Sequence, residues 1–313
     1  MADIAELQRR LNNLRAIEHL VRSMRAMAAI RWRRARHRLR SAQSYAAEVQ
    51  RLLNTAVQYP SPLVSPGGMP PHPSAAQEVT GLIVITSDRG LCGAFNLSLV
   101  GFASDFIARE RERGRQVKII ALGRYGENFF RKSSYEVIYA HPLPLTHAIS
   151  FLETREISER IEELYQQGEF DQLYLIYNAF VAFGRYRRVE IRLLPPELAI
   201  PPRAEEGPEL PLLGSDVVEL QRYLLSEHLA VQVHLALVES MVSEQGARLQ
   251  TMEAALNNIR DRIEALRLEY NMARQESITQ EVLEIAAGAE AQARGYANRA
   301  FPPITFKTSL AKC

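Results

Sequence analysis

The segment between residues 86 and 96 carries the side chains of this sequence that are best placed to do chemistry. It reads TSDRGLCGAFN, and it follows a predicted buried strand and precedes a predicted helix. In α/β enzymes this position often holds a phosphate-binding loop or a nucleophile. The residues to consider are Asp88, Arg89, Gly90, Leu91, Cys92 and Gly93.

The spacing within this segment argues against both chemistries. It has neither the GxGxxG nor the GxxxxGK[ST] spacing, and no lysine lies beside it. Cys92 could act as a nucleophile, but the sequence identifies no base for it. We therefore interpret the segment as a tight strand-to-helix turn that its glycines permit. We expect no catalytic residue and no cofactor.

The remaining reactive side chains give no sign of a metal or disulfide framework. The seven histidines are scattered without a pair at metal-ligand spacing. His19, His37, His228 and His234 lie on predicted helices, where we expect surface or packed histidines rather than ligands. The two cysteines, Cys92 and Cys313, form no disulfide framework, which favours a reducing compartment. We expect no membrane-spanning segment and no signal peptide.

Arginines gather in the first 40 residues and make nucleic acid a candidate partner. The stretch from Arg9 to Arg40 contains 11 Arg and one Glu. The same stretch, however, carries a full apolar helical seam, and only Trp32 offers a ring for stacking on a base. We therefore expect no nucleic acid partner. The alternative is that the chain is a coiled-coil structural protein, or a nucleic-acid-binding protein, with a basic N-terminal helix.

Both ends of the chain have apolar residues at alternating steps of three and four, which is typical of helices that pack against another helix. The N-terminal seam runs through Ile4, Leu7, Leu11, Leu14, Val21, Ala28, Trp32, Ala35, Leu39, Ala42, Ala46, Val49, Leu53 and Ala56. The C-terminal seam runs through Leu249, Met252, Leu256, Ile259, Ile263, Leu266, Tyr270 and Ala273. Only Glu18 and Arg25 interrupt the first seam, and we expect them to pair with C-terminal residues.

Opposite charges favour pairing of the two ends with each other. Residues 1–58 hold 12 Arg and 4 acidic residues, whereas residues 215–300 hold 8 Arg and 13 acidic residues. A positive and a negative seam helix attract, so we expect the two helices of one chain to pack together.

Between the seams, strand and helix patterns alternate, which is typical of an open α/β sheet of Rossmann-like type. The predicted strands are 79–86, 117–122, 135–139, 173–177 and 189–194, and the predicted helices are 96–113, 125–131 and 149–167. We expect a helix at 1–59, linkers at 60–77 and 195–214, an α/β domain at 78–194, a helix at 215–300 and a tail at 301–313. Gly246 is a candidate bend in the last helix.

Three blocks of the sequence resemble the gamma subunit of F-type ATP synthases, the central rotor shaft. They are residues 86–96, residues 122–131 and, most specifically, residues 268–285, which read LEYNMARQESITQEVLEI and match that family's YNxARQxxITxE pattern. Further residues stand at the family's spacings: Ser243, Glu244, Ala247, Arg248, Met252, Ala255 and Asn258. The similarity covers nearly the whole chain in order.

The resemblance implies a role without chemistry of its own. The terminal helices would form an antiparallel coiled coil inside a ring of alternating alpha and beta subunits, and the α/β domain would contact the epsilon subunit and the membrane c-ring. One copy would serve each complex, peripheral to the cytoplasmic face of a bacterial plasma membrane. The implied contacts to the beta subunit are Met24 and Arg25, with Arg274, Gln275 and Thr279 facing Met24. An apolar tip is expected over residues 282–300.

Overall fold

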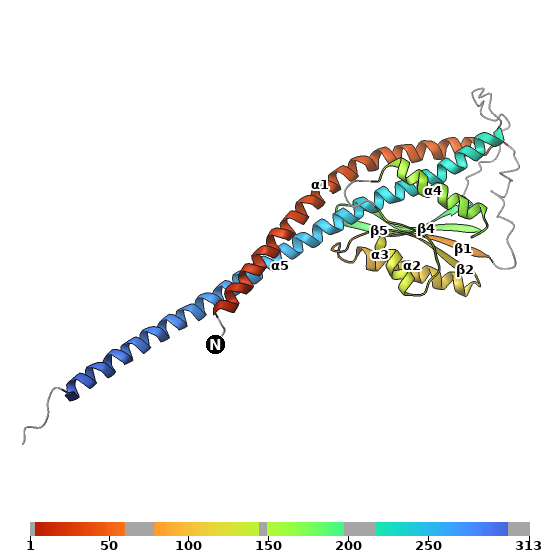
Figure 1. Cartoon of the computed structure of the whole chain (residues 1–313). Helices are drawn as coiled ribbons and strands as arrows, with labels where there is room; N and C mark the ends of the chain where they lie inside the picture. The colour runs from red at the N-terminus through yellow and green to blue at the C-terminus, as the bar shows by residue number, and fades with distance from the viewer. Residues whose placement is uncertain (1–3, 60–77, 144–148, 197–216, 300–313) are drawn as a thin grey trace, which may run out of the picture. The chain divides into compact units, whose positions relative to one another are not determined.

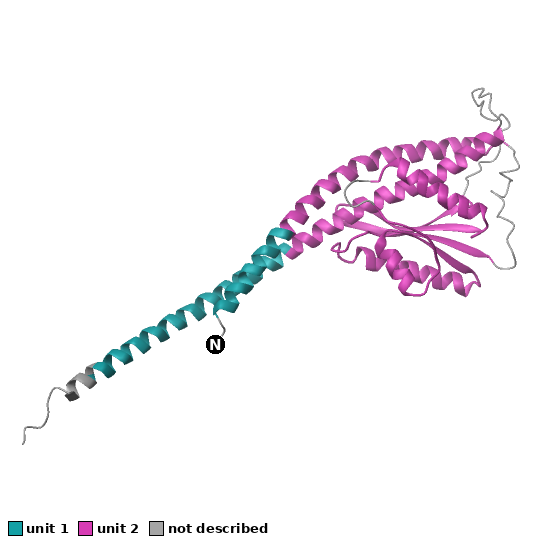
Figure 2. Cartoon of the chain, in the orientation of Figure 1, with its two compact units in different colours: residues 1–20, 256–313 teal, residues 21–255 magenta. Residues whose placement is uncertain are grey.

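The computed structural model describes residues 4–59, 78–143, 149–196 and 217–299. The chain divides into two compact units (Figure 2): residues 1–20 with 256–313, and residues 21–255. This division cuts across both terminal helices, so the domain boundaries drawn from the sequence remain a prediction. Most of the two proline-rich linkers, and the whole tail, lie outside the described residues.

Two long helices and a set of short elements make up the described chain (Figure 1). The helices are α1 (Ile4–Ala56), α2 (Phe95–Glu112), α3 (Arg124–Lys132), α4 (Phe151–Gln166) and α5 (Val217–Arg299). The strands are β1 (Val79–Ile85), β2 (Gln116–Leu122), β3 (Val137–His141), β4 (Gln172–Ala182) and β5 (Arg185–Leu194). Every helix and strand that the alternating pattern predicted is present, with ends that differ by a few residues.

The described strands form one sheet in the order β3-β2-β1-β4-β5. β1 pairs in parallel with β2 and β4, and β2 pairs in parallel with β3, which confirms the open α/β sheet. β4 and β5 pair antiparallel because Phe183 and Gly184 join them in a tight hairpin, with Gly184 at φ +67°. The predicted strands 173–177 and 189–194 are therefore too short, since both continue into the hairpin.

Helices cover both faces of this sheet within residues 21–255 (Figure 1). On one face, Leu82 and Val84 pack against α2 and against Phe130 of α3. On the other face, Ile83 and Ile85 pack against α4 and against the α5 segment that contains Leu229 and Val233. A continuous apolar strand such as β1 requires cover on both sides, and the long helix supplies part of it.

The apolar seams of α1 and α5 pack against each other in antiparallel fashion inside each unit. In residues 21–255 the buried pairs progress in opposite directions: Ala35 and Leu39 with Val238 and Val242, Ala46 and Val49 with Val231, and Leu53 and Ala56 with Leu224. In the other unit, Leu7 and Leu11 pack with Ile263 and Leu266. The predicted pairing of the two chain ends is thus confirmed.

The two charges that interrupt the N-terminal seam both pair with α5. Glu18 lies 3.6 Å from the Nε of Arg260 inside the first unit. Arg25 donates from Nη1 to Glu253 Oε2 at 2.6 Å inside the second. These ion pairs confirm the prediction for both residues and help to fix the register of the coil.

Gly246, the candidate bend, lies within the uninterrupted last helix. α5 continues as one helix through this position. A Cβ at Gly246 would lie 3.4 Å from the backbone nitrogen of Gly184 and 3.5 Å from Nε1 of Trp32. The glycine therefore allows α5 to approach the β4–β5 hairpin and α1 closely.

Candidate functional site

The turn between β1 and α2 is held by its own polar side chains. The backbone nitrogen of Ser87 donates to Asn96 Oδ1 at 3.0 Å, and Asn96 Nδ2 donates to Ser87 Oγ at 2.7 Å. Leu91 and Gly93 both have positive φ, at 64° and 61°. These contacts close the turn internally, which agrees with its interpretation as a tight turn.

The carboxylate of Asp88 is used for the same structural purpose. Its Oδ1 accepts hydrogen bonds from the backbone nitrogens of Arg124 at 3.0 Å and Leu143 at 2.9 Å. The side chain is only 4% exposed and also lies 3.4 Å from Arg124 Nε. Asp88 thus joins the turn to the start of α3 and to the chain after β3.

Cys92 lies in a packed environment that disfavours nucleophilic chemistry. The residue is 2% exposed and packs with Phe95 and with Ala247 of α5. Burial raises the pKa of its thiol, and the charge of Glu244 adds to this effect. A thiol that stays protonated is a poor nucleophile.

The same turn is the place where α5 is attached to the α/β elements. Arg248 of α5 donates from Nη2 to the carbonyl oxygens of Arg89 and Gly90, both at 3.3 Å, and its Nη1 lies 2.6 Å from Glu244 Oε1. A Cβ at Gly93 would come within 2.9 Å of Thr251 Oγ1. Only glycine fits this contact without displacement, and its backbone conformation also favours glycine.

A second close contact joins α5 to the β4–β5 hairpin. A Cβ at Gly184 would lie 1.9 Å from Nε2 of Gln250. Trp32 of α1 stacks edge-to-face on Phe183 with ring centroids 5.1 Å apart. The α5 segment from 244 to 251 is therefore fixed between two turns of the sheet and α1.

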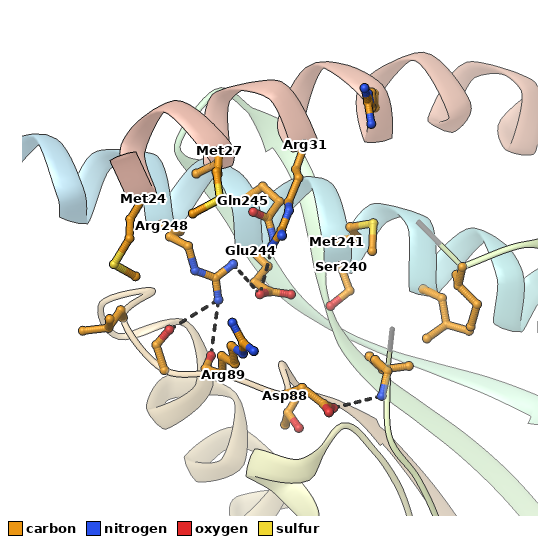
Figure 3. A pocket seen from close by; sticks show the side chains of 18 of the residues that line it. Met24, Met27, Arg31, Asp88, Arg89, Ser240, Met241, Glu244, Gln245 and Arg248 are labelled. Carbon is orange, nitrogen blue, oxygen red and sulfur yellow. Dashed lines mark hydrogen bonds and ion pairs between the residues drawn. The ribbon is translucent and has the colours of Figure 1, made fainter. Parts of the chain in front are cut away.

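A cavity of about 320 Å³ lies between this turn, α1 and α5 (Figure 3). Apolar and cationic side chains dominate its lining, which includes Met24, Met27, Leu91, Leu143, Leu237, Met241, Arg31, Arg34, Arg38, Arg89 and Arg248. The two acidic lining residues, Asp88 and Glu244, already have the partners described above. The cavity is thus suited to a side chain or segment that carries negative charge on an apolar body.

The structure divides the predicted beta-subunit contacts between the two units. Met24 is half-buried and lines the cavity, and Arg25 lies beside it in the ion pair with Glu253. Arg274, Gln275 and Thr279 are exposed on α5 in the other unit. The expectation that these three face Met24 is wrong, because the antiparallel register places this part of α1 opposite Glu253, roughly six helical turns before Arg274.

The arginines and Glu244 were not expected to belong to one site. Arg31, Arg34 and Arg38 stand at steps of three and four, so they share one helix face with Met24 and Met27. Glu244 and Arg248 stand four residues apart, the spacing of an intrahelical ion pair. Helical spacing could have grouped each set, but only the register of the coil brings the two sets together.

Several large apolar side chains of α5 are exposed among polar ones in the first unit. Met272, Val282, Leu283 and Ile285 are between 59% and 73% exposed, and the last three lie within the stretch where an apolar tip was expected. Glu281 and Glu284 are exposed beside them, so this surface is mixed in character.

Within the described ranges, no group of three or more His, Cys, Asp or Glu is placed to hold a metal ion. Among the helices in that part of the chain, none is long and apolar enough to cross a membrane.

Comparison with known proteins gives a consistent result. A family model described as ATP synthase matches residues 3–292. The chain is 34% identical to the ATP synthase gamma chain of Desulfitobacterium hafniense over 93% of its own length and 99% of that protein. It is also 34% identical to the ATP synthase gamma chain of Alkaliphilus metalliredigens, covering 91% of this chain and 97% of that one.

A solved structure supports the fold. A chain in the Euglena gracilis mitochondrial ATP synthase structure (OSCP/F1/c-ring) aligns with a TM-score of 0.68 at 18% identity, covering 98% of this chain and 99% of that chain. The sequence similarity extends through both terminal helices and the α/β elements between them. The chain therefore belongs to the family of ATP synthase gamma chains, the non-catalytic central-stalk subunits of that complex.

Proposed function

We propose that this chain turns as the rotor inside a ring of alternating alpha and beta subunits and couples ion flow through a membrane c-ring to ATP synthesis or hydrolysis. One copy serves each complex. The α/β elements contact the epsilon subunit and the c-ring, and the paired helices α1 and α5 extend into the ring. The chain works at the cytoplasmic face of a bacterial plasma membrane, where its partner subunits hold it.

The observation that carries this proposal is the asymmetric antiparallel coil of α1 and α5. A rotor must present a different surface to each of the surrounding sites at any instant. A coil of two unlike helices presents different surfaces in different directions, because an arginine-rich helix forms one side and an acidic helix the other. The pairing of Glu18 and Arg25 with α5 keeps this arrangement in register.

The contacts to the beta subunit form two groups in this proposal. Met24 and Arg25 form one group beside the arginine-lined cavity, which favours a beta-subunit loop that carries carboxylates. Arg274, Gln275 and Thr279 form the other group, on the exposed face of α5. Exposed polar side chains can exchange partners as the shaft turns, because no deep side-chain packing holds them.

Reconstitution tests the proposal. The chain is mixed with alpha and beta subunits from the same organism, and the products are separated by size and assayed for ATP hydrolysis. We expect a complex with one copy of the chain and an ATPase activity that the chain alone lacks. If the unmodified chain does not co-purify with alpha and beta subunits, the proposal is wrong.

A further inference from the structure

Three glutamates of α5 share an arrangement that the role of a simple shaft does not require. Glu227, Glu239 and Glu244 each lie at a point where α5 meets both α1 and the α/β elements. Glu227 is 5% exposed, and the side chain of Glu244 is 16% exposed. Withdrawing carboxylates from water is unfavourable unless each one is hydrogen-bonded or paired, so their partners matter.

The first glutamate joins three helices. Glu227 Oε1 accepts a hydrogen bond from the hydroxyl of Tyr45 on α1 at 2.6 Å. Its other oxygen, Oε2, accepts from Arg155 Nη2 on α4 at 2.6 Å. One carboxylate therefore connects α5 to the partner helix of the coil and to the helix that covers the sheet.

The second glutamate joins α5 to a strand. Glu239 Oε2 accepts from the hydroxyl of Tyr177 on β4 at 3.0 Å. Gln43 of α1 lies near enough to act on the same carboxylate and opposes the rise that burial causes in the pKa of Glu239. The connection thus runs from α1 through α5 to one of the two inner strands that flank β1.

The third glutamate joins α5 to the β1–α2 turn through an arginine (Figure 3). Glu244 binds Arg248, which donates to the carbonyl oxygens of Arg89 and Gly90 in that turn. Arg31 of α1 lies close enough to act on the charge of Glu244. Here too α1, α5 and the α/β elements meet at one carboxylate, but the link is an ion pair with an arginine instead of a tyrosine hydroxyl.

The spacing of these glutamates along α5 allows them to transmit force between the coil and the α/β elements. Glu227 and Glu244 are separated by roughly 25 Å of helix. The hydrophobic effect between α5 and the sheet is non-directional, so by itself it opposes sliding of α5 along the sheet only weakly. Hydrogen bonds to charged groups are directional and stronger than neutral ones. Attachment at three separated points prevents rotation of the α/β elements about the coil, which one point would allow.

We propose that Glu227, Glu239 and Glu244 form the torque-bearing joint that holds the coil of α1 and α5 to the α/β elements. The inference rests on the proposed rotor function and adds the residues that carry the load between its two parts. These glutamates act through the groups they position and do not contact nucleotide.

The test uses the complex of the chain with alpha and beta subunits and replaces all three residues together, by Glu227→Gln, Glu239→Gln and Glu244→Gln. The matched control is Glu219→Gln, since Glu219 is an exposed glutamate in the first turn of α5. Hydrogen exchange of the β1–α2 turn and of β4 reports loosening of the joint. We expect about tenfold faster exchange there in the triple variant, because a hydrogen bond to a charged group contributes about that factor. The control should exchange like the unmodified complex.

A rotational readout separates a mechanical from a merely structural role. A bead attached to the α/β elements of the immobilised complex shows wider thermal fluctuation in angle when the joint is loose. The triple variant should fluctuate more widely than the control and still hydrolyse ATP. A disulfide between Cys92 and an introduced Ala247→Cys, in a Cys313→Ser background and formed with an added oxidant, should restore the narrow distribution. A cross-linked variant whose distribution stays wide counts against the joint.

A second pair of substitutions keeps the proposal testable if the triple variant does not assemble. Tyr45→Phe with Tyr177→Phe removes only two hydroxyl donors and keeps the ring packing. We expect a smaller widening in the same direction. An assembled, active complex with unchanged exchange and unchanged fluctuation in these variants would overturn the joint while leaving the rotor function intact. A wild-type chain that never assembles would instead overturn the rotor function.

Discussion

The two units of this chain use the same pair of helices in different ways. Within residues 21–255, α5 is attached to α1, to α4 and to the sheet by apolar packing and by the three carboxylates. Within residues 1–20 and 256–313, the described contacts are a narrow apolar seam and the Glu18–Arg260 pair. There, α5 leaves large apolar side chains such as Leu283 and Ile285 exposed.

The difference separates two requirements of a rotor shaft. A region that carries load needs directional attachments and close backbone approach, which explains the glycines at Gly93, Gly184 and Gly246. A region that moves against other subunits needs a surface that no part of its own chain occupies. In the proposed rotor, a ring of partner subunits covers the large apolar side chains that α5 leaves exposed there.

The largest expected difference in unfolding free energy is between truncation of a packed side chain in one unit and truncation of an exposed side chain in the other. Phe95→Ala removes a ring that is 0% exposed and packs between Ala247 and Tyr186. We expect a loss of about 3–5 kcal/mol in the free energy of unfolding, measured by urea denaturation. The matched change Leu283→Ala, at a side chain that is 64% exposed, should stay within about 0.5 kcal/mol. Equal effects at both positions would remove the contrast between the units.

Acid should weaken the packed unit through His228. Burial lowers the pKa of His228 to about 4, and its Nδ1 has no hydrogen-bond partner among the described residues. The folded chain therefore keeps this histidine neutral while the unfolded chain takes up a proton below about pH 6.5. Stability from this group is present above that pH and decreases as the pH falls toward 4, by up to about 3 kcal/mol.

Comparison with a variant isolates this contribution from those of other titrating groups. The unfolding free energies of wild type and His228→Leu are measured by denaturation between pH 7 and pH 4. The difference between the two proteins should change across that window, with wild type losing stability relative to the variant. Parallel curves would show that His228 titrates normally in the folded chain.

Replacement of one glycine by alanine in each unit compares how closely the backbone of each unit is packed. Gly184→Ala places a methyl group against Gln250 at a residue with φ +67°, so we expect about 1–3 kcal/mol of destabilisation. Gly288→Ala lies in open space within α5 and should stabilise the helix by up to about 1 kcal/mol. Thermal unfolding measures both changes. The same sign at both positions would contradict the close approach of α5 to the hairpin.

The helical seams and the alternating strands were accessible from sequence because each is a local pattern. A step of three or four positions predicted which α1 residues are buried. The two charged interruptions were expected to pair with C-terminal residues, and the structure shows which ones, Arg260 and Glu253. The antiparallel direction of β5 was not predicted, because no turn motif in the sequence marks the two-residue hairpin at Phe183 and Gly184 between the apolar β4 and the arginine-rich β5.

The site depended on contacts that no local pattern contains. Glu227, Glu239 and Glu244 look like ordinary acidic positions on an amphipathic helix. Only the fold supplies Tyr45 and Tyr177 as partners of the first two, and only the fold lets Arg248, the partner of Glu244, reach the turn at Arg89. Met24 was proposed as a contact through family resemblance, and its place in a cavity shared with residues of α5 follows from the register of the coil. Register depends on side-chain packing along the whole length of two helices, which spacing alone does not fix.

Rotation of the assembled complex gives the sharpest test of the rotor role. A complex of alpha and beta subunits with this chain is immobilised through its ring, and a bead is attached to the α/β elements of the chain. On addition of ATP, we expect sustained rotation of the bead in one direction, with the torque retained by the Glu219→Gln control and reduced in the triple Glu→Gln variant. Hydrolysis of ATP by the wild-type complex without rotation of the bead would contradict it.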